Sequence, residues 1–149
     1  MSSSYETLLG SEMDESGIDE FLRRTGVGVL SMSADGVPYG VPLSFGYDGE
    51  HLYFLFVGRS AALRKETYAE RSDEASFVAF DVDADGNWRS VIVAGPIDRI
   101  TPGQWDAARA ALADNAFESD LLSAHDLREH PNVWALDVEE RSGRVVGSE

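Results

Sequence analysis

The stretch that decides the fold is "VGVLSMSADGVPYGVPLSFGYDGEHLYFLFV", residues 27–57. It predicts three strands joined by tight turns at "ADG" and "YDGE": residues 27–33, 37–45 and 51–57. The middle strand contains Pro38 and Pro42, and proline has no N–H group to donate to a neighbouring strand. We therefore expect this strand to lie at the edge of a sheet, or to face something other than a strand.

The rest of the chain continues a mainly β pattern. Further strands are expected over residues 75–82, over 88–100 with a bend at Gly95-Pro96, and over 132–139. Helices are expected over residues 14–24, over 61–71 after a cap at Ser60, and from Thr101 onward, with an ambiguous short helix within 117–130. Strands and helices do not alternate regularly, which favours a small antiparallel barrel with capping helices.

Length and composition indicate one compact domain. The chain has 149 residues, of which 43% are hydrophobic, and we assign 14–149 to the domain and 1–13 to a flexible N-terminal segment. No apolar run is long enough to span a membrane, and the N-terminus lacks the basic and apolar regions of a signal peptide. These features predict a cytoplasmic protein. The absence of cysteine excludes disulfides, thiolate metal sites and cysteine nucleophiles.

The net charge limits the possible partners. Asp and Glu number 27 against 12 Lys and Arg, which gives a net charge of −15. Such a surface repels nucleic acid and anionic membranes, so neither is expected as a partner. Many carboxylates with a single lysine, Lys65, favour a protein adapted to concentrated salt, where charge repulsion is screened. An acidic protein from an ordinary environment is the alternative.

Common catalytic motifs are missing from the sequence. It contains no glycine-rich phosphate loop, no nucleophile elbow and no HExxH. His125 and His130 lie near Asp126 and Glu129, but a solvated polar helix is the favoured interpretation, so no metal site is predicted.

One pattern points to a binding site. In "LFVGRS", residues 55–60, a strand runs into the start of a helix at Ser60, with Arg59 and Arg64 nearby. A helix N-terminus offers free N–H groups and a positive dipole end, which suit a phosphate. The alternative is that Ser60 only caps the helix.

Three segments in order resemble the flavin-binding split-barrel family that includes pyridoxamine 5′-phosphate oxidase: "VPLSF" (41–45), "GRSAALRKE" (58–66) and "WRSVIVAGPI" (88–97). The resemblance implies a six-stranded antiparallel split barrel. It also implies a homodimer that holds one FMN at each end of its interface.

The resemblance also assigns roles to individual residues. Pro42, Leu43 and Ser44 would lie along the flavin ring, and Phe56 and Val57 would line the ring and ribityl chain. Ser60 would take the phosphate, and Ser90 would reach the cofactor from the adjoining strand, either of its own chain or of the partner subunit. Two cations common in this turn are replaced by Ala61 and Ala62, so other basic residues are expected to substitute for them: Arg59, Arg64 and Arg89.

The function implied by the resemblance is an FMN-dependent oxidoreductase acting on a small molecule of unknown identity. Its chemistry would be the cofactor's own hydride or electron transfer. Two alternatives remain open. One is a catalytically silent barrel that holds flavin, haem or nothing, and the other is an enzyme that uses a deazaflavin.

Overall fold

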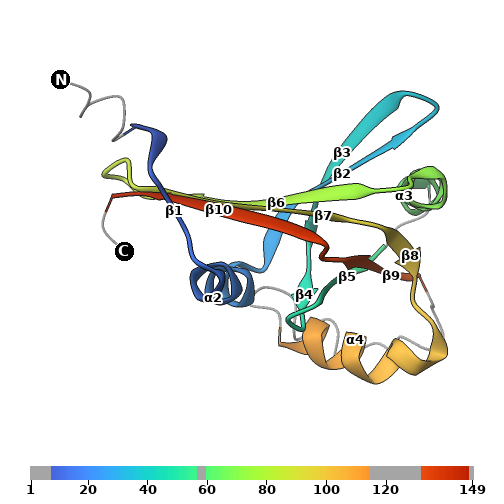
Figure 1. Cartoon of the computed structure of the whole chain (residues 1–149). Coiled ribbons are helices and arrows are strands. Elements are labelled where there is room, and N and C mark those ends of the chain that lie inside the picture. Colours follow the sequence, from blue (N-terminus) through green and yellow to red (C-terminus); the bar gives the residue numbers. More distant parts are fainter. Residues whose placement is uncertain (1–7, 57–59, 115–131, 148–149) are drawn as a thin grey trace.

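The computed structural model describes residues 8–56, 60–114 and 132–147. Its strands form two antiparallel sheets, one of six strands in the order β1-β10-β7-β6-β2-β3 and one of four in the order β4-β5-β9-β8 (Figure 1). The strands are β1 Ser11–Glu12, β2 Val27–Ala34, β3 Val37–Ser44, β4 Gly46–Tyr47, β5 His51–Leu55, β6 Ala75–Val82, β7 Trp88–Gly95, β8 Ile97–Arg99, β9 Val133–Asp137 and β10 Glu140–Val146.

The helices begin and end where the sequence places their signals. In α2, Glu15–Thr25, the Asp14 side chain accepts a hydrogen bond from the Gly17 N–H at 2.7 Å, and Gly26 ends the helix with a φ of 78°. The other helices are α3 Ser60–Arg71, the short 3₁₀ helix η1 Pro102–Gln104, and α4 Trp105–Ala113. The expected helices at 14–24, at 61–71 and after Thr101 are therefore confirmed, whereas the ambiguous segment 117–130 lies outside the described residues.

The β2–β3 hairpin confirms that β3 is an edge strand. Asp35 and Gly36 both have positive φ, 53° and 80°, as a two-residue type I′ turn requires. The turn makes Ala34 and Val37 the closing hydrogen-bonded pair, and the alternation along the ladder then leaves Pro38 and Pro42 at non-hydrogen-bonded positions. Their missing N–H groups would point away from β2, so the two prolines remove no ladder bond.

The bend expected at Gly95-Pro96 carries the chain from one sheet to the other. Before the bend, β7 pairs with β6 and β10 in the six-stranded sheet, and after it β8 pairs with β9 in the four-stranded sheet. The single strand expected over 88–100 is therefore two strands in two sheets.

Strand β10 is not among the strands predicted from the sequence, the last of which ends at residue 139. The structure instead pairs Glu140–Val146 along the whole of β7, and β1 pairs with β10 through Ser11 and Glu12. Residues 11 and 12, placed by the sequence in the N-terminal segment, thus extend the sheet. The sequence "ERSGRVV" shows no apolar alternation that would predict a strand, and one of its seven residues, Gly143, is buried.

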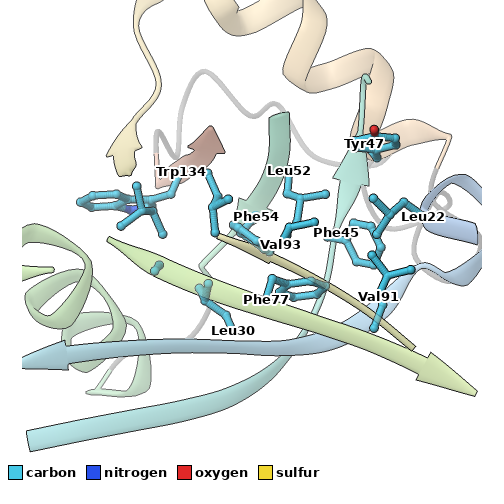
Figure 2. Packing of buried hydrophobic residues seen from close by; sticks show 14 of the residues in the cluster. Leu22, Leu30, Phe45, Tyr47, Leu52, Phe54, Phe77, Val91, Val93 and Trp134 are labelled. Atoms are coloured by element: carbon cyan, nitrogen blue, oxygen red, sulfur yellow. The ribbon is translucent and has the colours of Figure 1, made fainter. Parts of the chain in front are cut away.

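The main core lies between the two sheets and α2 (Figure 2). Phe77 of β6 contacts both Phe45 and Phe54, with ring centroids 4.8 and 5.3 Å apart. Helix α2 adds its buried face, made of Ile18, Phe21 and Leu22. Helices α2 and α4 and the small sheet lie on one side of the six-stranded sheet, and no described helix or strand covers its other side (Figure 1).

We call that uncovered side the outer face. Alternate residues of its strands point there, and several are large and apolar, with Phe80 56%, Val82 64% and Ile92 49% exposed. The register gives the residues that share this face, among them Val27, Val29, Pro42, Ser44, Val78, Phe80, Val82, Trp88, Ser90 and Ile92. The apolar character of 75–82 thus exceeds what one copy of the chain buries.

A polar cluster ties α2 to both sheets. The Tyr47 hydroxyl donates to Asp19 Oδ1, and the Arg141 guanidinium donates to the same oxygen at 2.7 Å and to the Tyr47 oxygen at 2.9 Å. The hydrogen bond from Tyr47, helped by Arg141 and Arg23, lowers the pKa of Asp19 below its ordinary value. Burial, together with the bond to Asp19, raises the pKa of Tyr47 to about 12.

We expect Asp19 to contribute to the acid sensitivity of the fold. Its lowered pKa stabilises the folded state above the unfolded pKa of about 4, and this contribution is lost as the pH falls through the folded pKa. Asp19→Asn should therefore lower stability at pH 7 and flatten the loss of stability below pH 4. Urea unfolding across that range at fixed salt measures it, with Glu20→Gln on the same helix as the control. An Asp19→Asn profile parallel to that of the wild type would contradict the role.

Candidate functional site

The outward edge of β3 presents an unusual set of backbone groups. Residues 38, 40, 42 and 44 direct their backbone groups away from β2, and two of the four are prolines. Among these residues, Gly40 and Ser44 keep outward N–H groups, while all four keep an outward carbonyl oxygen. Odd-numbered residues point the other way, and the Phe45 N–H accordingly donates to the Gly26 oxygen at 3.0 Å, which confirms the alternation. The edge is therefore rich in acceptors, with few donors.

Helix α3 runs alongside the same hairpin. Its last residue, Arg71, pairs with Asp35 at the turn at 2.7 Å, and one helical turn earlier Tyr68 contacts Tyr39 of β3, with ring centroids 4.8 Å apart. Toward the helix start, the Arg64 guanidinium lies 4.7 Å above the Tyr39 ring. These contacts place the C-terminal part of α3 beside the hairpin turn and Arg64 beside Tyr39 of β3.

The start of α3 is suited to an anion. Its first turn contains no acidic residue, although the chain has 27 acids. Among the described residues, no carboxylate pairs with Arg64, whose guanidinium is held by the face of Tyr39. The sequence pattern nominates Ser60 and Arg64 but not Tyr39, because the contact between Tyr39 and Arg64 depends on the packing of α3 against β3.

Ser90 and Arg89 lie away from the place where α3 contacts β3. Ser90 lies on the outer face of β7, three strands from β3, which is about 14 Å at the usual strand spacing. Arg89 points to the opposite side, where it lines a hollow beside α2 and lies 3.7 Å from Asp81. Within one chain, therefore, neither residue joins the group formed by β3 and α3.

The structure places Phe56 in the core. It is 2% exposed and stacks on Trp134 with ring centroids 5.7 Å apart. Asn132 holds both, since its side-chain amide donates to the Phe56 oxygen at 3.2 Å and its side-chain oxygen accepts from Trp134 Nε1 at 2.9 Å. Val57 and Arg59 lie outside the described residues, as does the side chain of Ser60.

A groove of about 500 Å³ opens on the outer face beside β3. Its walls come from the ends of β2, β3, β6 and α2, and Pro42 is the predicted site residue that it contains. No local sequence pattern predicts this groove, because its lining residues come from three separate parts of the chain, residues 24–29, Pro42 and residues 80–81.

The histidines give no metal site that the structure describes. His51 binds Asp137 through Nε2 at 2.7 Å and joins β5 to β9, which is a structural contact. His125 and His130 lie outside the described residues. In the part of the chain that is described, no group of three His, Cys, Asp or Glu could hold a metal ion.

Comparison with known protein families identifies the chain. The model of a family described as pyridoxamine 5′-phosphate oxidase matches residues 14–145, which extend from the cap of α2 to β10. The chain belongs to this family. The resemblance seen in the three sequence segments is therefore confirmed, and the family match extends it over both sheets.

Solved structures of the same fold include an FAD-binding protein from Mesorhizobium loti, with 22% identity and a TM-score of 0.74 over 93% of this chain and 99% of that one. An FAD- and haem-binding protein from Mycobacterium smegmatis has 18% identity and a TM-score of 0.70, covering 94% and 74%. An FAD-binding protein from the same organism has 17% identity and a TM-score of 0.63, covering 92% and 100%. These likenesses confirm the split-barrel fold class of this family member.

A search of curated proteins found no match to this chain. Among the described residues, no helix has the length and apolar character needed to cross a membrane.

Proposed function

We propose that this chain is an FMN-dependent oxidoreductase of a small molecule, with the cofactor held where β3 meets the start of α3. The observation that supports this most is the pairing of an acceptor-rich strand edge with a helix start that lacks acids and has a cation nearby. The family match and the flavin-binding proteins of the same fold support the choice of a flavin.

Part of the β3 edge, at residues 42 and 44, can pair with the polar side of a flavin ring. Such a ring has one N–H donor between two carbonyl acceptors, so the outward carbonyl oxygen of Pro42 can accept from the ring N–H and the outward N–H of Ser44 can donate to one ring carbonyl. The second ring carbonyl would need a donor from elsewhere, because Pro42 has no N–H. Pro42 adds a flat apolar surface without a competing donor. The strand would thus orient the ring, with Leu43 packed behind it against the core.

The start of α3 fits the phosphate. Ser60 begins the helix, so its first N–H groups have no partners within the helix. Arg64 is the cation best placed to substitute for those absent at Ala61 and Ala62, because the Tyr39 ring positions it and no described carboxylate neutralises it.

The cofactor and the residues of the chain would have different roles in the reaction. A bound flavin supplies hydride or electron transfer. The chain's own residues bind the cofactor, fix the orientation of its ring and cover part of it from water. None of the described groups is nominated as a general acid or base.

We further propose that two copies associate through the outer face. Apolar side chains as exposed as Phe80, Val82 and Ile92 on one face are typical of an interface, and pairing the faces would bury them. Ser90 lies on this face, about 14 Å from β3 of its own chain, so it would approach the cofactor bound by the partner.

The double substitution Ser60→Ala with Arg64→Ala is expected to weaken FMN binding at least tenfold, because it removes a hydroxyl and a charge-assisted contact to the phosphate. Quenching of flavin fluorescence at fixed salt measures the affinity. Arg71→Ala is the control, since this arginine lies on the same helix but pairs with Asp35 at its far end. Unchanged FMN affinity in the double variant would place the phosphate elsewhere.

Identification of the bound chromophore tests the cofactor directly. The protein is purified in concentrated salt, its absorption spectrum is recorded, and any released compound is identified as FMN, FAD or a deazaflavin. Reduction of the bound flavin by NADH or NADPH then separates an oxidoreductase from a silent binder. A colourless protein that FMN does not stabilise against heat would contradict the proposal.

A further inference from the structure

The groove on the outer face combines apolar walls with one cation. Val29 lies between Pro42 of β3 and Val78 of β6 in the register of the sheet. Val27 and Phe80, which are 40% and 56% exposed, form its open side. Arg24, near the end of α2, lines the same groove. This arrangement suits a ligand that has an apolar body and a polar end.

The charges of the groove favour a negative ligand. Asp81 also lines it, but its carboxylate lies 3.7 Å from Arg89, which offsets its charge. Arg24 has no such partner, because among the described residues no carboxylate pairs with it and its guanidinium lies 5.5 Å from the centre of the Phe21 ring. Arg24 also lines the adjoining hollow that contains Asp14 and Glu20, but no described carboxylate forms an ion pair with it, so its charge is available to an anion in the groove.

We infer that the groove is a substrate site for a small organic anion with an aromatic or apolar body, whose charged end pairs with Arg24. The inference rests on the proposed function for the reaction itself, since Pro42 belongs both to the groove and to the strand proposed to hold the flavin ring. A molecule in the groove would lie beside that ring. Association of two copies through the outer face would cover the groove and strengthen the contact by excluding water.

The test compares two isosteric probes that differ in charge, 1-naphthoate and 1-naphthamide, by equilibrium dialysis against the protein as purified. Wild-type protein is expected to bind the naphthoate at least fivefold more tightly. Arg24→Gln should remove this preference by weakening naphthoate binding about fivefold and leaving the naphthamide unchanged. Arg23→Gln is the matched control, because this neighbouring arginine lies over Tyr47 outside the groove and should keep the preference.

Phe80→Ala tests whether the two probes bind in the groove. It removes an apolar wall and should weaken both probes by a similar factor of about three or more. Equal binding of the two probes by the wild type, a preference that survives Arg24→Gln, or full affinity in Phe80→Ala would each overturn the inference.

Titration with FMN separates this inference from the proposed function. If Arg24→Gln weakens FMN as much as it weakens the naphthoate, then Arg24 holds the cofactor and the substrate class is wrong. If FMN does not bind at all but the probes behave as expected, the flavin proposal fails while the anion site stands. FMN binding that is unaffected by Arg24→Gln, together with the expected probe pattern, supports both.

Discussion

Gly95→Ala is expected to destabilise the protein by about 3 kcal/mol or more, enough to make it insoluble or unfolded at moderate temperature. Gly95 ends β7 at the point where the chain passes from the large sheet to the small one. A methyl group there would overlap the backbone carbonyl oxygen of Asp137, where β9 ends. Backbone cannot yield as a flexible side chain can, so the junction between the sheets would have to open.

Gly40→Ala is the matched control for this change. Gly40 is exposed on the edge strand β3, and the nearest atoms that an added methyl group would meet are 3.8 Å away, in ordinary contact. Urea unfolding monitored by tryptophan fluorescence compares the two variants. A stable Gly95→Ala protein, with an unfolding midpoint within error of the control, would show that the sheets can separate at this point without loss of the fold.

Ile92→Glu is expected to convert the proposed dimer into monomers. In the proposed association each glutamate would be buried against a second outer face, and an unpaired buried charge costs several kcal/mol. In a single chain Ile92 is 49% exposed, so the same change should alter the stability of the monomer by less than about 1 kcal/mol. Light scattering in concentrated salt measures the mass, and FMN affinity should fall with it if Ser90 of the partner subunit takes part.

Val37→Glu controls for the added charge. Val37 is 53% exposed and lies on β3, but it is paired with Ala34, whose side chain points to the core side of the sheet. This variant should keep the mass of the wild type. If both variants remain dimeric, the outer face is not the interface, and if the wild type is itself monomeric, the shared site is wrong.

Local signals explain what the sequence could predict. Residues 27–57 contain their own turns, and the positive φ of Asp35 and Gly36 shows why "ADG" marks the hairpin. Asp14 and Gly26 likewise define α2 through short-range contacts. Strand β10 has no such signal, since its position depends on a partner strand about fifty residues earlier in the chain.

The candidate site depends more on tertiary packing. The order of segments along the chain nominated Pro42, Ser44 and Arg64, and their role in binding stays a prediction. Strand alternation alone puts Ser90 and Arg89 on opposite faces, but only the sheet order shows that Ser90 lies three strands from β3. The order of segments also could not show that Phe56 stacks inside the core on Trp134, because both faces of β5 are apolar.

The two prolines of β3 have a consequence for solubility in concentrated salt. An open strand edge can recruit the edge of another molecule and begin a fibril, and proteins commonly prevent this with charged side chains. That defence weakens as salt screens the charges. Of the four outward-facing residues of β3, Pro38 and Pro42 have no N–H group. A strand that docked on this edge would therefore lose two of its four possible hydrogen bonds from β3 N–H groups, at any ionic strength. This protection comes from the covalent structure of proline, so a high salt concentration does not weaken it.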